Sequence, residues 1–146
     1  MRNLIVRETL IFASVGLSFE LLIVLLLGFG SRTDFIFPVG VSIVGLYLAA
    51  ILLGILFGTI LDRKPPGKSR FFIGGMLVAW LCLIVQALFG SSVEYLRNSD
   101  QLDAFWDYIF KPFFWIVFLG TIPAIAIGAL YSVRIKMLYA RIEKVP

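Results

Sequence analysis

Four long apolar stretches, separated by short polar ones, divide the chain. Each has about 20 residues, the number that a helix needs to cross about 30 Å of hydrocarbon. They cover residues 9–30, 38–61, 71–90 and 112–131. Because these stretches and their flanks fill nearly the whole sequence, the pattern predicts a single domain over residues 1–146. We expect an all-α integral membrane protein with four transmembrane helices arranged as two hairpins.

Proline and glycine positions mark the ends of the expected helices. Pro38 and Pro112 stand where the second and fourth stretches begin, and a helix loses nothing there by the missing N–H. The Pro-Pro-Gly sequence at 65–67 ends any helix between the second and third stretches. Pro123 lies inside the fourth stretch and predicts a kink, which membrane helices tolerate.

The segment 91–111 is the longest connection between two apolar stretches. Apolar residues recur in its second half at roughly helical spacing, which predicts a short amphipathic helix over 100–110 on the membrane surface. Asn98, followed by Gln101, is a plausible capping box for that helix. The alternative is an irregular loop with aromatic residues at the membrane interface.

Positive charge is distributed unevenly between the two ends of the expected bundle. Of 13 Lys and Arg residues, three (Arg32, Arg97 and Lys111) fall on one side and the other ten on the opposite side. The positive-inside rule therefore places both termini in the cytoplasm, in a multi-pass protein of the plasma or inner membrane. The connection after the second stretch contributes four cations, which set topology or bind anionic lipid headgroups: Arg63, Lys64, Lys68 and Arg70.

Small residues form a line on each of the last three expected helices. Residues four apart lie on the same helix face, and small side chains let membrane helices approach closely. These lines predict helix packing within the bundle, while a pore lining or a contact between subunits is the alternative. Their members are Ala50, Gly54 and Gly58 in the second helix, Gly75 and Ala79 in the third, and Gly120, Ala124 and Gly128 in the fourth.

Glu20 is the one acidic residue within the four apolar stretches, which contain no Lys or Arg. A carboxylate in mid-bilayer costs at least a few kcal/mol, so intramembrane acids need a partner or a function. Counting residues from the intervening turn places Tyr47 at the same depth, with Gln86 and Thr121 near that level. We predict a polar cluster of these four residues. Glu20 then serves as a structural hydrogen-bond donor, as a contact with a partner subunit, or as a carrier of protons or cations.

The sequence contains few of the residues and motifs on which enzymatic chemistry depends. It has no histidine, its single cysteine is Cys82, and it contains no phosphate-binding or zinc-hydrolase motif. We expect no metal site, no cofactor and no nucleic-acid partner. Binding of a quinone or lipid in an apolar groove remains an alternative.

Two function classes follow from these features. The first is a small non-enzymatic integral membrane subunit that stabilises, assembles or regulates a larger complex, with membrane lipids and other integral membrane proteins as its partners. The alternative is a small homo-oligomeric transporter or channel in which Glu20 couples protons or cations. A lipid-modifying enzyme is a third and weaker possibility.

Overall fold

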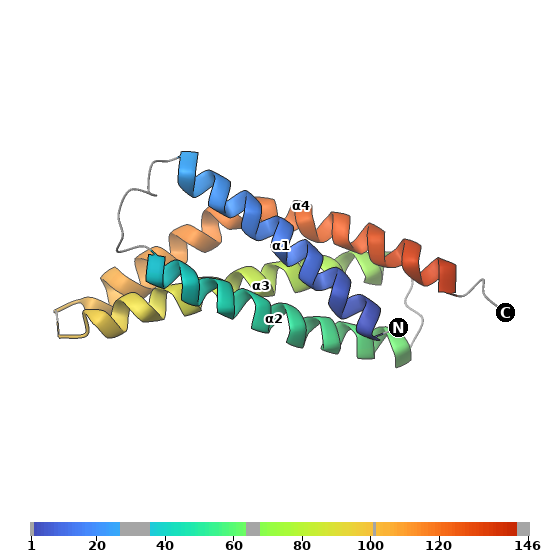
Figure 1. The fold of residues 1–146 in the computed structure, drawn as a ribbon, viewed down its shortest axis with the longest axis horizontal. Helices are drawn as coiled ribbons and strands as arrows, with labels where there is room; N and C mark the ends of the chain where they lie inside the picture. The colour runs from blue at the N-terminus through green and yellow to red at the C-terminus, as the bar shows by residue number, and fades with distance from the viewer. Residues whose placement is uncertain (1, 27–35, 64–67, 101, 143–146) are drawn as a thin grey trace.

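The computed structural model describes residues 2–26, 36–63, 68–100 and 102–142, and their side chains over 2–22, 39–61, 71–100 and 102–141. These residues are almost entirely helical (Figure 1). The elements are α1 (Arg2–Leu26), α2 (Ile36–Arg63), α3 (Lys68–Arg97), the π-helix η3 (Trp106–Phe110) and α4 (Lys111–Ile142). In Figure 1 the α-helices lie roughly along one common axis and alternate in direction, so both chain ends lie at the same end of the bundle.

Three helices are long and apolar enough to cross a membrane. They include the segments Val39–Leu61, Phe71–Arg97 and Trp106–Arg141. This finding supports a membrane-embedded helical protein. The expected first span, 9–30, runs beyond the described residues, and the described part of α1 carries Arg7, Glu8 and Glu20. The fourth span and the cytoplasmic placement of the termini therefore remain predictions.

Helix α3 lies at the centre of the packing, against α2 on one side and α4 on the other. Helix α1 packs mainly against α2 and less extensively against α4. The buried core between the helices is apolar and aromatic, with Ile5, Phe57, Leu61, Tyr131 and Ile135 among its members.

The small residues of α2 lie where α1 crosses it. A Cβ atom placed on Gly54 would lie 3.2 Å from the Cα of Val6, and one on Gly58 would lie 3.3 Å from the Cα of Arg2. Ala50, one turn earlier, is completely buried.

The small residues of α3 and α4 face each other. A Cβ atom on Gly128 would lie 2.7 Å from the Cα of Met76 and 3.1 Å from the Cβ of Ala79, and one on Gly75 would lie 3.0 Å from the carbonyl oxygen of Gly128. Ala124 is buried on the same helix, and Gly120 lies under the side chain of Leu83. At both crossings the absence of side chains sets how closely the backbones approach.

The prediction of a separate surface helix over 100–110 is wrong. Helix α3 continues to Arg97, and after a short turn the chain is helical again from Ala104 through η3 directly into α4. The Lys111 N–H donates to the carbonyl oxygen of Trp106, five residues back. Because this wider π turn changes the hydrogen-bond ladder next to Pro112, the missing N–H is accommodated and no break forms there.

The expected capping box pairs Asn98 with a residue whose structure is not described. The Asn98 side chain donates to the carbonyl oxygen of Glu94 at 2.9 Å, so it closes the end of α3. Gln101 lies outside the described residues. The turn is made instead with Asp103 at φ 70°, a left-handed conformation that Asp tolerates better than most residues. Pro123 lies within α4, which changes direction part-way along its length in Figure 1.

Candidate functional site

Glu20 meets Gln86 in the middle of the bundle. The Gln86 side-chain amide of α3 donates to a carboxyl oxygen of Glu20 in α1. The backbone carbonyl of Gln86 accepts a hydrogen bond from the Ser42 hydroxyl of α2 at 3.1 Å. Gln86 is buried and Glu20 is half-buried, so these contacts join three helices at one polar point in an apolar region. The amide supplies a hydrogen bond but no charge, and Glu20 forms no ion pair with any described residue.

Tyr47 and Thr121 lie in separate polar contacts. The Tyr47 hydroxyl is 2.8 Å from the Ser14 hydroxyl. The Thr121 hydroxyl donates to the carbonyl oxygen of Val117 at 2.5 Å and accepts from the Trp80 indole at 3.4 Å. The structure therefore brings Glu20 and Gln86 together, and it divides the expected four-residue cluster into three pairs.

The reason for this division is the way in which α1 crosses α2. Counting residues from the turn places Tyr47 level with Glu20 only if the two helices run side by side. The close crossing at Gly54 and Gly58 is with the first half of α1, so the Tyr47 hydroxyl meets Ser14. Ser14 precedes Glu20 by six residues, or about 9 Å of helix.

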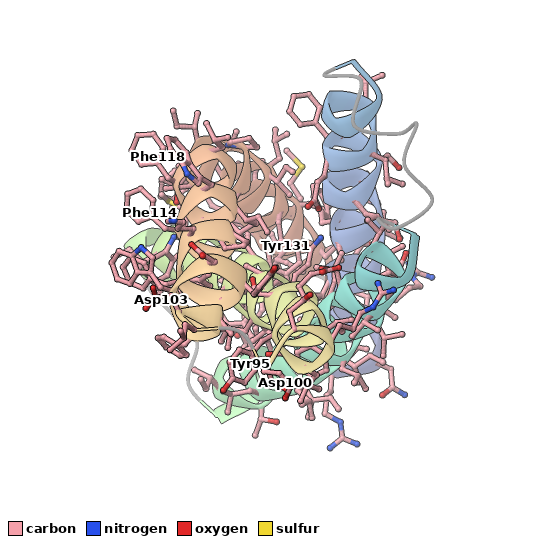
Figure 2. The ribbon with its side chains drawn as sticks, turned by 90° about the vertical axis from the view of Figure 1, so that its left-hand side faces the viewer. Tyr95, Asp100, Asp103, Phe114, Phe118 and Tyr131 are labelled. Carbon is pink, nitrogen blue, oxygen red and sulfur yellow. The ribbon has the colours of Figure 1, made fainter. Side chains whose placement is uncertain are left out.

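A second polar cluster, absent from the sequence predictions, joins α1 to α4 near the chain ends. Glu8 is only 3% exposed. Its carboxyl oxygens lie 3.4 Å from Nε of Arg134 and 3.5 Å from a guanidinium nitrogen of Arg7. One residue further on, the Thr9 hydroxyl is 2.7 Å from the hydroxyl of Tyr131, which Figure 2 shows between the helices.

This cluster left a signal in the sequence. Glu8 lies one residue before the first apolar stretch and Arg134 three residues after the fourth, so both belong to the same end of the bundle. Because both residues lie outside the apolar stretches, the charge pattern within those stretches does not indicate this ion pair.

The third feature is the end of the α3–α4 hairpin, residues 94–107, which we call the hairpin tip. It carries large apolar side chains with few contacts: Leu96 is 74% exposed, Leu102 is 96% exposed and Phe105 is 59% exposed. In Figure 1 the hairpin tip extends past the start of α2.

The hairpin tip is also acidic. Arg97 lies 3.9 Å from Glu94, and Lys111 lies 2.5 Å from Asp107. Within the described part of the chain, no ion pair includes Asp100 or Asp103, and both are exposed. Figure 2 looks onto this end of the molecule and shows both aspartates there.

From the hairpin tip onward, aromatic rings form a ladder along η3 and the first turns of α4. Trp106 and Phe110 stack with their ring centroids 4.3 Å apart, and Phe114 and Phe118 stack at 5.9 Å. Figure 2 shows Phe114 and Phe118 on the outside of the bundle. Only 11% of the most apolar stretch of α4 is buried, against 28% for α2 and 33% for α3. Helix α4 thus has the largest free apolar face of the three.

Two further expectations concern charged residues. Lys64 lies outside the described residues, and so do the side chains of Arg63, Lys68 and Arg70. Within the described residues, no group of three or more His, Cys, Asp or Glu side chains is placed to hold a metal ion.

Comparison of the chain with protein-family models, curated protein sequences and solved structures finds no match. The functional assignment therefore rests on the three features described above.

Proposed function

We propose that this chain is a small, non-enzymatic integral membrane subunit that stabilises, assembles or regulates a larger membrane complex. We further propose that the hairpin tip is its contact with the partner. The observation that carries the proposal is the exposure of Leu102, which is 96% exposed in the turn between the apolar segments Phe71–Arg97 and Trp106–Arg141.

Helix length supports a projecting hairpin tip. Helix α3 has 30 residues, which is about 45 Å at 1.5 Å per residue, and the hydrocarbon layer is about 30 Å thick. Residues 91–97 were expected outside the apolar stretch and continue the helix beyond it. Leu102 lies beyond both apolar segments, and exposed apolar side chains outside a membrane segment are typical of interaction sites.

The charge of the hairpin tip indicates the kind of partner. Asp100 and Asp103 are acidic groups without ion pairs to described residues, and they flank the most exposed leucine. Complementary charge favours a partner that presents basic residues just outside the membrane. The aromatic ladder on α4 continues the same surface toward the bilayer and offers a second, apolar area of contact.

Native mass measurement after gentle detergent extraction tests this proposal. We expect the chain in a stoichiometric complex with a different membrane protein, and we expect Leu102→Asn to weaken that complex. Met137→Asn is the matched control, because Met137 is also an exposed apolar residue of the α3–α4 hairpin but lies near the chain ends. A chain found only as a monomer, or a complex equally weakened by both substitutions, contradicts the proposal.

The second candidate is a homo-oligomeric transporter or channel, favoured by the pairing of Glu20 with Gln86 among apolar helices. An acid placed within the membrane is a common coupling group for protons or cations. Purified chain in liposomes distinguishes the two functions. A homogeneous oligomer with proton or cation flux that is abolished by Glu20→Gln supports the transporter function. The same result excludes the function of an accessory subunit.

A further inference from the structure

Two arginines from different helices meet one buried carboxylate at the end of the bundle that holds the chain ends. Nε of Arg134 in α4 lies 3.4 Å from one carboxyl oxygen of Glu8, and a guanidinium nitrogen of Arg7 in α1 lies 3.5 Å from the other. The Glu8 side chain is buried, whereas those of Arg7 and Arg134 are 65% and 48% exposed. Two positive charges and one negative charge therefore leave a net charge of +1, which the two exposed guanidinium groups present.

The arginines keep most of their hydrogen-bond donors. A guanidinium group has five N–H donors in a rigid fork. Arg134 contacts Glu8 through Nε, so its two terminal nitrogens form no ion pair or hydrogen bond with a described residue. Arg7 contacts Glu8 through one terminal nitrogen. Because one carboxylate holds both groups, the two forks lie near each other and have donors left for an anion.

Apolar side chains continue from this cluster along both helices. On α1, Ile11 and Val15 follow Glu8 at three and seven residues and are 48% and 52% exposed. On α4, Leu130 precedes Arg134 by four residues and is 63% exposed. Residues at these spacings share a helix face. The surface where α1 meets α4 therefore changes from two cations to exposed apolar side chains toward the middle of the bundle.

We propose that this surface, which we call the arginine site, binds an anionic phospholipid. Its phosphate group contacts Arg7 and Arg134, and an acyl chain covers the apolar side chains next to them. Arginine pairs with phosphate through two parallel hydrogen bonds, and basic sites between membrane helices are typical binding sites for anionic headgroups. The net charge of the cluster favours an anionic lipid over a zwitterionic one, whose positive group opposes the arginines.

The position of the cluster favours a lipid over a soluble phosphate ester. Glu8 lies one residue before the first apolar stretch, and Arg134 lies three residues after the fourth. Lipid phosphate groups lie just outside the hydrocarbon layer, which these stretches are long enough to cross. A soluble phosphate ester matches the two cations but leaves the apolar side chains beside them uncovered.

Lipid titration of the purified full chain tests the arginine site. The probes are dioleoyl phosphatidylglycerol and dioleoyl phosphatidylcholine, which share their acyl chains and differ in headgroup charge. Native mass spectrometry counts the lipids retained on each protein molecule. We expect one phosphatidylglycerol to be retained preferentially over phosphatidylcholine, and we expect an equal concentration of glycerol 3-phosphate not to displace it.

Substitutions separate this site from general attraction between the lipid and a basic protein. Each cation near an anionic lipid contributes a factor of about five in affinity. Arg7→Gln and Arg134→Gln are each expected to weaken retention about five-fold, and together about 25-fold. Lys136→Gln is the matched control and is expected to leave retention unchanged. Lys136 is exposed at nearly the same level of α4, but two residues correspond to about 200° around a helix, so it lies on the other side from Arg134.

Arg7→Gln keeps the proposal testable if loss of Arg134 prevents folding, which circular dichroism of the purified protein reports, because it leaves the contact between Glu8 and Arg134 in place. Equal retention of both lipids by the parent chain overturns the proposal. Equal losses in Arg7→Gln and Lys136→Gln also overturn it, because they show attraction to surface charge alone. Displacement by glycerol 3-phosphate overturns it in favour of a soluble phosphate ester. The result is independent of the partner complex, because the test uses the isolated chain and lipid.

Discussion

Single polar side chains connect α1 to the other helices at two levels of the bundle. At mid-depth Glu20 accepts from Gln86, and near the chain ends Glu8 lies between Arg7 and Arg134. Hydrogen bonds between membrane helices contribute about 0.6 kcal/mol on average, up to about 1.7 kcal/mol. These contacts orient α1 more than they stabilise it, because its apolar packing on α2 involves many more atoms.

The contact between Glu20 and Gln86 is predicted to depend on an oxygen acceptor rather than on charge. Glu20→Gln keeps a carbonyl oxygen for the Gln86 amide, so the free energy of unfolding in mixed micelles should change by less than about 0.5 kcal/mol. Gln86→Leu removes the donor and should cost about 0.6 kcal/mol, up to about 1.7 kcal/mol. A double-mutant cycle with Glu20→Leu measures the pair directly. Additive effects of the two leucine substitutions would show that the contact contributes nothing.

The ion pair between Glu8 and Arg134 gives the second prediction at this scale. Arg134→Gln leaves a buried carboxylate with Arg7 as its remaining described cation, and we expect a loss of about 1–2 kcal/mol, reduced because Arg134 is half exposed. Lys136→Gln, two residues further along α4, removes a cation that forms no ion pair with a described residue. It should cost less than about 0.5 kcal/mol. Thermal denaturation of both variants checks this, and equal losses would contradict it.

The sequence identifies which residues need partners better than it identifies the partners. Glu20 stood out because it is the one acid in four apolar stretches, and depth counting placed Gln86 near its level. Depth counting predicts Tyr47 beside Glu20 because it assumes helices that run side by side, whereas the crossing of α1 and α2 pairs Tyr47 with Ser14. Contacts of this kind depend on crossing angles, which a single sequence does not contain.

Among the elements, the lines of small residues determine where helices approach. Those of α2 face α1, and those of α3 and α4 face each other, so the spacing seen in the sequence corresponds to actual crossings. What the sequence does not indicate is which line faces which helix, because each line is compatible with several neighbours. The assignment depends on the whole arrangement of the bundle.

Gly128 is predicted to be the least replaceable of these residues. A Cβ atom there would lie 2.7 Å from the Cα of Met76 and 3.0 Å from the carbonyl oxygen of Gly75, and backbone atoms have little freedom to move. Gly128→Ala should therefore destabilise the chain by about 1–3 kcal/mol. Gly40→Ala is the control, since nothing lies within 4 Å of a Cβ atom at that position. A melting temperature lowered equally by both substitutions would contradict a close crossing at Gly128.

The end of the α3–α4 hairpin shows where element prediction fails. The apolar pattern stops near Gly90, but helix α3 continues for seven more residues, because mixed polar and apolar sequence also forms helix once a partner helix lies beside it. The proline at position 112 indicated a start, and the π turn before it allows the helix to pass through. Apolar periodicity thus predicts the part of a helix inside the membrane and not its full length.

For the whole molecule, the arrangement combines a packed centre with two surfaces that the chain does not cover itself. Helix α3 is enclosed by α2 and α4, while the outer face of α4 and the hairpin tip have few contacts. Lipid covers the first of these within the bilayer. The turn of the hairpin tip, with Leu102, lies between the apolar segments Phe71–Arg97 and Trp106–Arg141, and it is there that the proposed function requires a protein partner.

The most direct test of this account is the mass of the chain in its native membrane complex after extraction in a mild detergent. We predict a defined hetero-complex that is lost or weakened by Leu102→Asn and kept by Met137→Asn. A monomer, or a homo-oligomer whose liposome flux depends on Glu20, would contradict the account.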